Sequence, residues 1–327
     1  MKRIAFVALL ICISLSSAAQ EKPVVISGYL FGDYYAVVSH HDASLEGKNA
    51  FWIRRGYLTF DRTISDALSA RLRFEINQPG DFRTTANAEP YVKDAWLKWK
   101  RSPKLDVIVG ISPAPAFETI EKAWGYRSVE KTPLDLQKMA VSRDFGVAVI
   151  GTIGTRYRWH VMAGNGSGTG SETNDEKQIA GAFSIAPTKA TLIEVYADRD
   201  ARPGNDDRTT LQAFASLQRP HMRAGIQFAH QVREAGDIDV ASLFGVIDVR
   251  PNVTALARID RMFDANPDGA KIAYLPFSSK SRSTLFIAGI DWKAHKNVSV
   301  IPNVEIVRYD DGAASDILPR VTLYFAF

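Results

Sequence analysis

Strict alternation of apolar and polar residues recurs along almost the whole chain and limits its fold more than any other feature. Between Ser69 and Ile76, and again from Arg320 to the terminal Phe327, every second residue is apolar. An alternation with period 2 is typical of a β-strand with two different faces. After residue 19, no uncharged apolar run approaches the ~18 residues that a membrane-spanning helix needs. The sequence therefore predicts an all-β fold.

The alternating segments number about sixteen, and most have roughly the ~9–11 residues of a tilted membrane strand. We expect strands over residues 25–38, 51–64, 68–77, 91–100, 105–112, 145–153, 157–164, 178–186, 190–198, 208–218, 221–232, 239–249, 253–263, 283–293, 298–308 and 317–327.

The connections between these segments alternate between short and long. Short turns are expected over 65–67, 101–104, 187–189, 219–220, 250–252 and 294–297, and longer polar loops over 39–50, 78–90, 113–144, 165–177, 199–207, 264–282 and 309–316. This alternation is typical of a membrane barrel, which has short periplasmic turns and long outer loops. A soluble β-sandwich has crossover connections and no reason to place every long loop at one end. The predicted fold is therefore an antiparallel transmembrane β-barrel of about sixteen strands.

Aromatic residues near the ends of the predicted strands support a membrane location. With both termini on the periplasmic side, the alternation places Trp52 and Tyr91 outward at the outer rim. It places a second group outward at the periplasmic rim, namely Trp99, Tyr157, Trp159, Trp292, Phe325 and Phe327. Aromatic girdles at both membrane interfaces are typical of outer-membrane barrels.

The first residues have the pattern of a secretory signal peptide. Lys2 and Arg3 precede an apolar stretch from Ile4 to Leu15, and small residues follow up to Ala19. We expect residues 1–19 to be the signal peptide and 20–327 the barrel domain. The single cysteine, Cys12, lies in the signal segment, so the mature chain has no disulfide.

Composition provides no argument for a nucleic-acid partner. Removal of Lys2 and Arg3 lowers the basic count from 40 to 38, against 36 acidic residues. The glycine-rich stretch 164–170 is not followed by a helix pattern and is expected to be a flexible loop. The aspartates near 198–207 are expected to be solvated, and the pair His40 and His41 lacks further ligand spacing. We therefore expect no cofactor and no metal.

Two resemblances follow from particular residues. The last segment, RVTLYFAF from Arg320 to Phe327, resembles the closing strand of Gram-negative outer-membrane proteins, which the barrel assembly machinery reads. The blocks FWIRRGYLTF at 51–60, LRFE at 72–75, DAWL at 94–97 and IPNVE at 301–305 are similar to the phosphate-selective porin (O and P type) family. This resemblance implies an outer-membrane porin, a homotrimer, and basic side chains that face the pore.

The alternation also predicts which charged residues face inward, because a charge on the lipid face near mid-membrane costs about 2–4 kcal/mol. The expected basic lining residues are Arg55, Arg71, Arg73, Lys98, Lys100, Arg158 and Arg258. Like charges on neighbouring strands favour the passage of anions, so a mild anion preference is expected. Arg54 is predicted to face outward unless a bulge shifts the register.

The third long loop, from Pro113 to Asp144, contains a helix-like run, and its apolar residues indicate packing inside the barrel. The third loop of general porins is similar, since it folds into the barrel and narrows it. By that resemblance the constriction residues are Glu118, Glu121, Arg127, Glu130, Lys131 and Arg143. The alternative is a loop that lies over the outer mouth.

Three functions are compatible with these patterns. The first is a water-filled channel for passive diffusion of small hydrophilic solutes or anions. The second is a structural or adhesive barrel with a plugged lumen, and the third is an outer-membrane hydrolase. His160 and His230 lie on predicted strands, but no serine has a spacing that indicates a catalytic triad. We therefore expect a channel and no enzyme.

Overall fold

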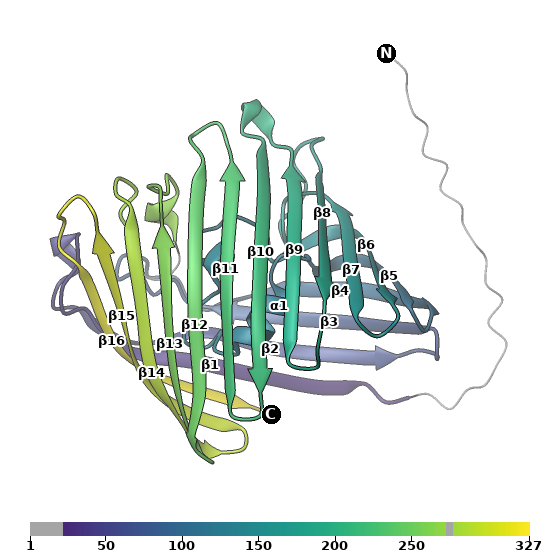
Figure 1. Ribbon diagram of the computed structural model, residues 1–327, viewed down its shortest axis with the longest axis horizontal. Helices are drawn as coiled ribbons and strands as arrows, with labels where there is room; N and C mark the ends of the chain where they lie inside the picture. Colours follow the sequence, from purple (N-terminus) through teal and green to yellow (C-terminus); the bar gives the residue numbers. More distant parts are fainter. Residues whose placement is uncertain (1–21, 273–276) are drawn as a thin grey trace.

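Sixteen antiparallel strands form one closed barrel in the computed structural model, which describes residues 22–272 and 277–327 (Figure 1). Each strand pairs with its neighbours in sequence, and β1 pairs with β16 to close the ring. The strands are β1 Val25–Ala36, β2 Asn49–Thr63, β3 Leu68–Asn77, β4 Glu89–Ser102, β5 Leu105–Pro113, β6 Arg143–Ile153, β7 Tyr157–Gly164, β8 Gln178–Ile185, β9 Thr191–Asp200, β10 Arg208–Arg219, β11 Met222–Val232, β12 Ile238–Arg250, β13 Val253–Met262, β14 Ser283–His295, β15 Val298–Tyr309 and β16 Asp316–Ala326.

The predicted strands are confirmed, and none of their boundaries differs from the structure by more than two residues. Short turns lie at the barrel end that also carries the start of β1 and the end of β16, and the longer loops lie at the other end (Figure 1). None of the helices in the described ranges is long and apolar enough to cross a membrane. The predicted signal peptide lies outside the described residues.

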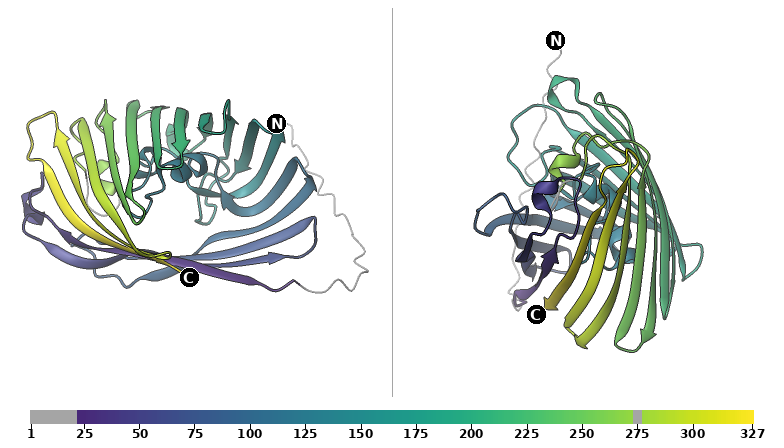
Figure 2. Two further views of the ribbon diagram at one scale, coloured as in Figure 1. Left: turned by 60° about the horizontal axis from the view of Figure 1, so that its bottom comes forward. Right: turned by 90° about the vertical axis from the view of Figure 1, so that its left-hand side faces the viewer.

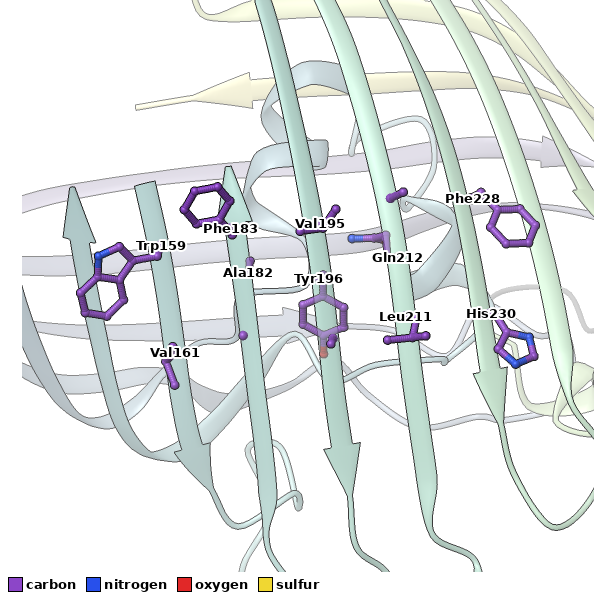
Figure 3. A pocket seen from close by; sticks show the side chains of 13 residues that line it. Trp159, Val161, Ala182, Phe183, Val195, Tyr196, Leu211, Gln212, Phe228 and His230 are labelled. Carbon is purple, nitrogen blue, oxygen red and sulfur yellow. The ribbon is translucent and has the colours of Figure 1, made fainter. Parts of the chain in front are cut away.

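The outer face of the barrel is apolar, as expected of a surface in contact with lipid. Figure 3 shows part of this face on β7 to β11, where a shallow hollow of about 690 Å³ crosses the strands. Its outward apolar side chains include Val161, Phe183, Val195, Leu211 and Phe228, which are all exposed. Acyl chains would fill such a hollow, so we do not regard it as a solute site.

Arginine substitutions on this face should follow membrane depth. Val195→Arg, in the middle of β9, should lower the free energy of unfolding in lipid by about 2–4 kcal/mol, whereas Ile153→Arg, at the end of β6, should lower it by only about 0–1 kcal/mol. Both native side chains are exposed on the outer face. Urea titration of refolded barrels in lipid vesicles would measure both values. Equal costs at the two positions would contradict a membrane belt.

A bulge between β1 and β2 corrects the predicted orientation of two residues. The pairing register shifts between Phe31 and Gly32, which makes Arg54 an additional residue in β2. Arg54 and Arg55 therefore both point inward, and Arg54 is buried. The prediction that Trp52 faces outward at the outer rim is also wrong, since it packs inward beside buried Tyr35.

A second bulge, between β3 and β4, has the same effect on Tyr91. The register shifts between Arg73 and Phe74, and Lys93 is the additional residue. Tyr91 points inward and hydrogen bonds with Glu75, so its predicted place at the outer rim is wrong. At the periplasmic end the predictions hold, because Trp99, Tyr157, Trp292 and Phe327 are exposed on the outer face.

Candidate functional site: the constriction and its loop

The loop between β5 and β6 folds into the barrel, as predicted (Figure 2). It contains two short helices, α1 Glu118–Trp124 and α2 Pro133–Leu136. Gly125 ends α1 in a left-handed conformation with φ 71°, which favours glycine because it has no Cβ. The loop's apolar side chains pack on the wall from β8 to β15, and Trp124 contacts Phe244 with ring centroids 5.4 Å apart. Burial of these side chains excludes a loop that only covers the outer mouth.

Two buried arginines fasten the middle of the loop to the wall. Arg54 donates to the carbonyl oxygens of Ser128 and Val129, and Arg320 also donates to Val129, at 3.0 Å. Arg54 pairs with Asp33, and Arg320 pairs with Glu305. Both guanidinium groups are thus neutralised by wall carboxylates and still satisfy two loop carbonyls. We call these four side chains, together with Glu130, the loop anchor.

Glu130 and Lys131, predicted as constriction residues, lie in the seam between loop and wall. Glu130 is 3.7 Å from Arg320, and both Glu130 and Lys131 are buried. Burial would raise the pKa of Glu130, but the positive charges of Arg320 and Arg54 offset this and hold it below its ordinary value. Glu130 therefore contributes a charge to the loop anchor.

Further hydrogen bonds between the loop and the wall lie near the two ends of the loop. Gln212 donates to the carbonyl oxygen of Ala116 at 3.2 Å, and Thr210 donates to that of Met139 at 3.1 Å. Thr119 donates to the carboxylate of Glu194 at 2.6 Å. The loop is consequently held at several points along its length.

Opposite the loop, strands β2 to β6 carry basic side chains that face the lumen. These side chains form ion pairs with carboxylates that are buried between them and the barrel wall. Arg143 and Arg73 lie 2.6 Å and 3.3 Å from Asp94. Arg55 and Lys93 both pair with Glu75, the latter at 3.1 Å. The Glu75 and Asp94 side chains are 0% exposed, whereas those of Arg73, Arg143 and Arg55 retain between 13% and 18%.

Arg71 extends this wall toward the short-turn end. Its side chain is 27% exposed and lies 2.7 Å from Asp61, which is itself 36% exposed. The basic wall is defined here as Arg55, Arg71, Arg73, Lys93 and Arg143. The positive groups of the basic wall reach the lumen surface. Of their three carboxylate partners, Asp61 is also exposed, whereas Glu75 and Asp94 are buried.

The loop presents both signs of charge to this wall. Arg127 lies between Glu121 and Asp135, at 3.4 Å and 3.2 Å. Burial raises the pKa of Glu121, although the charge of Arg127 opposes the shift. Burial would also raise the pKa of Asp135, but Lys131 and Arg127 offset this and leave it lowered. Both signs of charge therefore line the space between loop and wall.

The remaining predicted residues are distributed along the lumen. Arg158 pairs with Glu118 of α1 at 3.2 Å, and Lys98 lies 3.8 Å from Asp106. Lys100 is exposed near the periplasmic end of β4. Arg258 is buried under the loop, where it pairs with Asp260 at 2.6 Å and lies 5.3 Å from the Trp124 ring. The structure thus places Arg258 away from the basic wall.

The alternation pattern missed several residues of this site. Lys93 and Arg54 were missed because each is the additional residue of a bulge, and a bulge reverses the side-chain phase. The sequence identifies Arg320 only as a residue of the closing strand, and not as the hydrogen-bond donor to Val129 in the third loop. Asp135 lies in a loop, where strand alternation does not predict the direction of a side chain. The only sequence signal for its ion pair with Arg127 is that the two residues lie eight positions apart in the same loop.

At the outer mouth the structure adds Asp316 to the pair His40 and His41, with donor atoms of all three within 4.8 Å. Asp316 accepts from the Nδ1 of His41 at 2.9 Å and from the hydroxyl of Tyr309 at 2.6 Å. The backbone N–H of Asp42 donates to the Nδ1 of His40, which leaves the proton on Nε2. The contacts of His41 and Tyr309 with Asp316 join the loop after β1 to the outer ends of β15 and β16.

Comparison with solved structures places the fold among porins. The chain resembles an anion-selective porin from Comamonas acidovorans (TM-score 0.70, 12% identity, 93% of this chain and 99% of that chain). It also resembles the outer-membrane channel DcaP of Acinetobacter baumannii (0.66, 12%, 93% and 97%) and OmpF of Salmonella typhi (0.67, 10%, 93% and 97%). No protein-family model matches the chain, and no curated protein matches its sequence.

The closed sixteen-strand barrel with an inward third loop is thus the fold of Gram-negative outer-membrane porins. Its outer face of exposed apolar side chains and its charged interior are the distribution that a bilayer requires of a spanning barrel. The protein is an integral outer-membrane barrel.

Proposed function

We propose that the protein forms a water-filled channel for the passive diffusion of small hydrophilic solutes, with a mild preference for anions. The observation that carries this proposal is the basic wall. Its cations reach the lumen surface, whereas Glu75 and Asp94 are fully buried behind them. An ion in the lumen is closer to the cations than to these carboxylates, so Coulomb attraction favours anions.

We propose, more specifically, that the preferred anions are phosphate-like solutes. The resemblance to the phosphate-selective porin family supports it, and so does fold similarity to a porin described as anion-selective. The partly exposed guanidinium groups of Arg71, Arg73 and Arg143 add chemical support, because guanidinium forms paired hydrogen bonds with phosphate and carboxylate oxygens.

We further propose that the chain is exported by its signal peptide, inserted by the barrel assembly machinery through the strand ending in Phe327, and assembled as a homotrimer. We propose no enzymatic activity. In the described part of the chain, the ring of His230 bonds with Asp239, and no serine hydroxyl lies within hydrogen-bond distance of His160 or His230.

The test is single-channel recording of the refolded barrel in planar bilayers. We expect discrete conductance steps, and in a KCl gradient a reversal potential with the sign of chloride preference. A folded barrel that shows no steps would favour the structural or adhesive alternative with a plugged lumen. A reversal potential of the opposite sign would contradict the anion preference and leave the channel proposal intact.

A further inference from the structure

On the periplasmic side of the loop, the lumen contains a hollow of about 450 Å³ that is separate from the basic wall. The loop residues Gly125 to Ser128 bound it on one side, and the starts and ends of β1, β14, β15 and β16 bound it on the other. The lining residues used below are Tyr29, Tyr126, Tyr324, Arg223, Lys293 and Lys296. The volume lies within the range of about 300–1,000 Å³ that is usual for small-molecule sites.

Positive charge gathers in this hollow without an equal number of carboxylates. Among its lining residues in the described ranges, Asp291 is the single carboxylate, and it accepts from the hydroxyl of Tyr126 at 3.0 Å. Within those same ranges, no carboxylate forms an ion pair with Arg223, Lys293 or Lys296. Cations placed together without partners repel one another, and a bound anion relieves that repulsion.

Arg223 is held in position by contacts that leave its charge available. Its Nε donates to the carbonyl oxygen of Trp124 at 3.2 Å, and its guanidinium lies 5.2 Å from the centre of the Tyr126 ring. Neither contact neutralises the positive charge. The side chain is thus fixed before any solute arrives, which lowers the entropy that binding must offset.

Aromatic rings also line the hollow. Tyr29 and Tyr324 lie with ring centroids 5.9 Å apart and planes tilted by 38°. Tyr126 lies across the hollow on the loop. Tyrosine faces pack against flat or sugar rings, and tyrosine hydroxyls exchange hydrogen bonds with polar substituents.

We propose that this hollow is a binding subsite for a small organic anion that carries its phosphate or carboxylate on a ring. Arg223, Lys293 and Lys296 bind the anionic group, and the tyrosines contact the ring. The proposal builds on the proposed channel function, because it places a solute site next to the constriction. Since the hollow reaches Lys296 and Asn297 in the short turn after β14, we expect binding to be faster from the short-turn side than from the outer side.

The test uses single barrels in planar bilayers with KCl current as the readout. Glucose 6-phosphate and benzoate are the ring-bearing probes, and inorganic phosphate and acetate are their ringless controls. We expect the ring-bearing probes to interrupt the current in a concentration-dependent manner, more often when added on the short-turn side. Which of the two acts at lower concentration distinguishes a sugar phosphate from an aromatic acid as the preferred ligand.

Three variants make the test specific. In the Lys293→Gln, Lys296→Gln double variant, half-maximal interruption should need about tenfold more probe, because two solvent-exposed charge contacts are lost. Tyr324→Leu should weaken the ring-bearing probes only. Lys104→Gln removes the same charge from an exposed turn at the same barrel end, outside the hollow, and should change nothing.

Calorimetric titration of the same probes into the detergent-solubilised barrel measures binding without any current. It therefore tests the subsite independently of the channel proposal. If the heat of binding shows about tenfold weaker affinity in the double variant, the subsite is supported even in a barrel that passes no current. Absence of current would contradict only the channel proposal. Normal KCl current without interruption by any probe overturns the subsite. Equal effects of ringless anions, or equal weakening in Lys104→Gln, overturn it as well.

Discussion

The variant Arg320→Met should release the third loop from the barrel wall and increase single-channel conductance. Arg320 is fully buried, donates to the carbonyl oxygen of Val129 and neutralises Glu305, with Glu130 3.7 Å away. Its removal leaves two buried carboxylates without this cation. Breaking a buried ion pair in this way costs about 3–5 kcal/mol.

Hydration of the two carboxylates would reduce this free-energy cost. Water can reach them only if the loop segment around Val129 moves away from the barrel wall. We therefore expect larger and noisier current steps together with a lower unfolding free energy. Arg199→Met is the matched control, because Arg199 is exposed and pairs with Asp207 on an outer loop, where a salt bridge contributes only about 0–1 kcal/mol.

A stable barrel with unchanged conductance would show that the loop is held without the loop anchor. If Arg320→Met does not fold, the variant Glu130→Gln provides a second route. It keeps Arg320 paired with Glu305 and bonded to Val129, so conductance should stay close to that of the native barrel. A large conductance increase in this variant would contradict the assigned role of Arg320.

The second large effect concerns ion preference. We expect the double variant Arg71→Gln, Arg73→Gln to reverse the mild anion preference to a cation preference. A unit charge about 6 Å from a passing ion contributes about 0.7 kcal/mol in water. That value is about a threefold change in ion partition for each arginine. The loss of both should change the permeability ratio by about tenfold.

Stability should hardly change in this variant, because Asp94 keeps Arg143 at 2.6 Å and Asp61 is 36% exposed to water. The opposite substitutions on the loop, Glu121→Gln with Asp135→Asn, should shift the ratio toward anions. Reversal potentials in a KCl gradient would measure both shifts. Shifts in the same direction for both variants would mean that neither set of charges lies on the ion path.

The alternation of apolar and polar residues was sufficient to predict the strands of this fold. Each strand pairs with its neighbour in sequence, so the boundaries of sixteen strands follow from alternation and turn residues alone. The terminal strand ending in Phe327 and the exposed rim residue Trp292 follow for the same reason. The expectation that the third loop enters the barrel came from its apolar residues, which needed a partner surface.

The composition of the site could not be derived in the same way. Arg54 and Lys93 face inward only because bulges between neighbouring strands insert one additional residue, and the same bulge turns Trp52 away from the lipid. A register shift of one residue moves every following side chain to the other face. The charges of Arg54 and Lys93 on an apparent lipid face indicate such a shift, but only the strand pairing of the closed barrel shows where it occurs.

Local sequence thus determined the barrel, the end at which its long loops lie and the loop that enters it, because strand periodicity and membrane burial act on neighbouring residues. Tertiary structure alone decided which charges face water and which are buried. Glu75 and Asp94 support the basic wall from behind, and Arg320 joins the last strand to the third loop. These contacts join residues that are distant in sequence, and their electrostatic energies depend on burial that only the closed barrel creates.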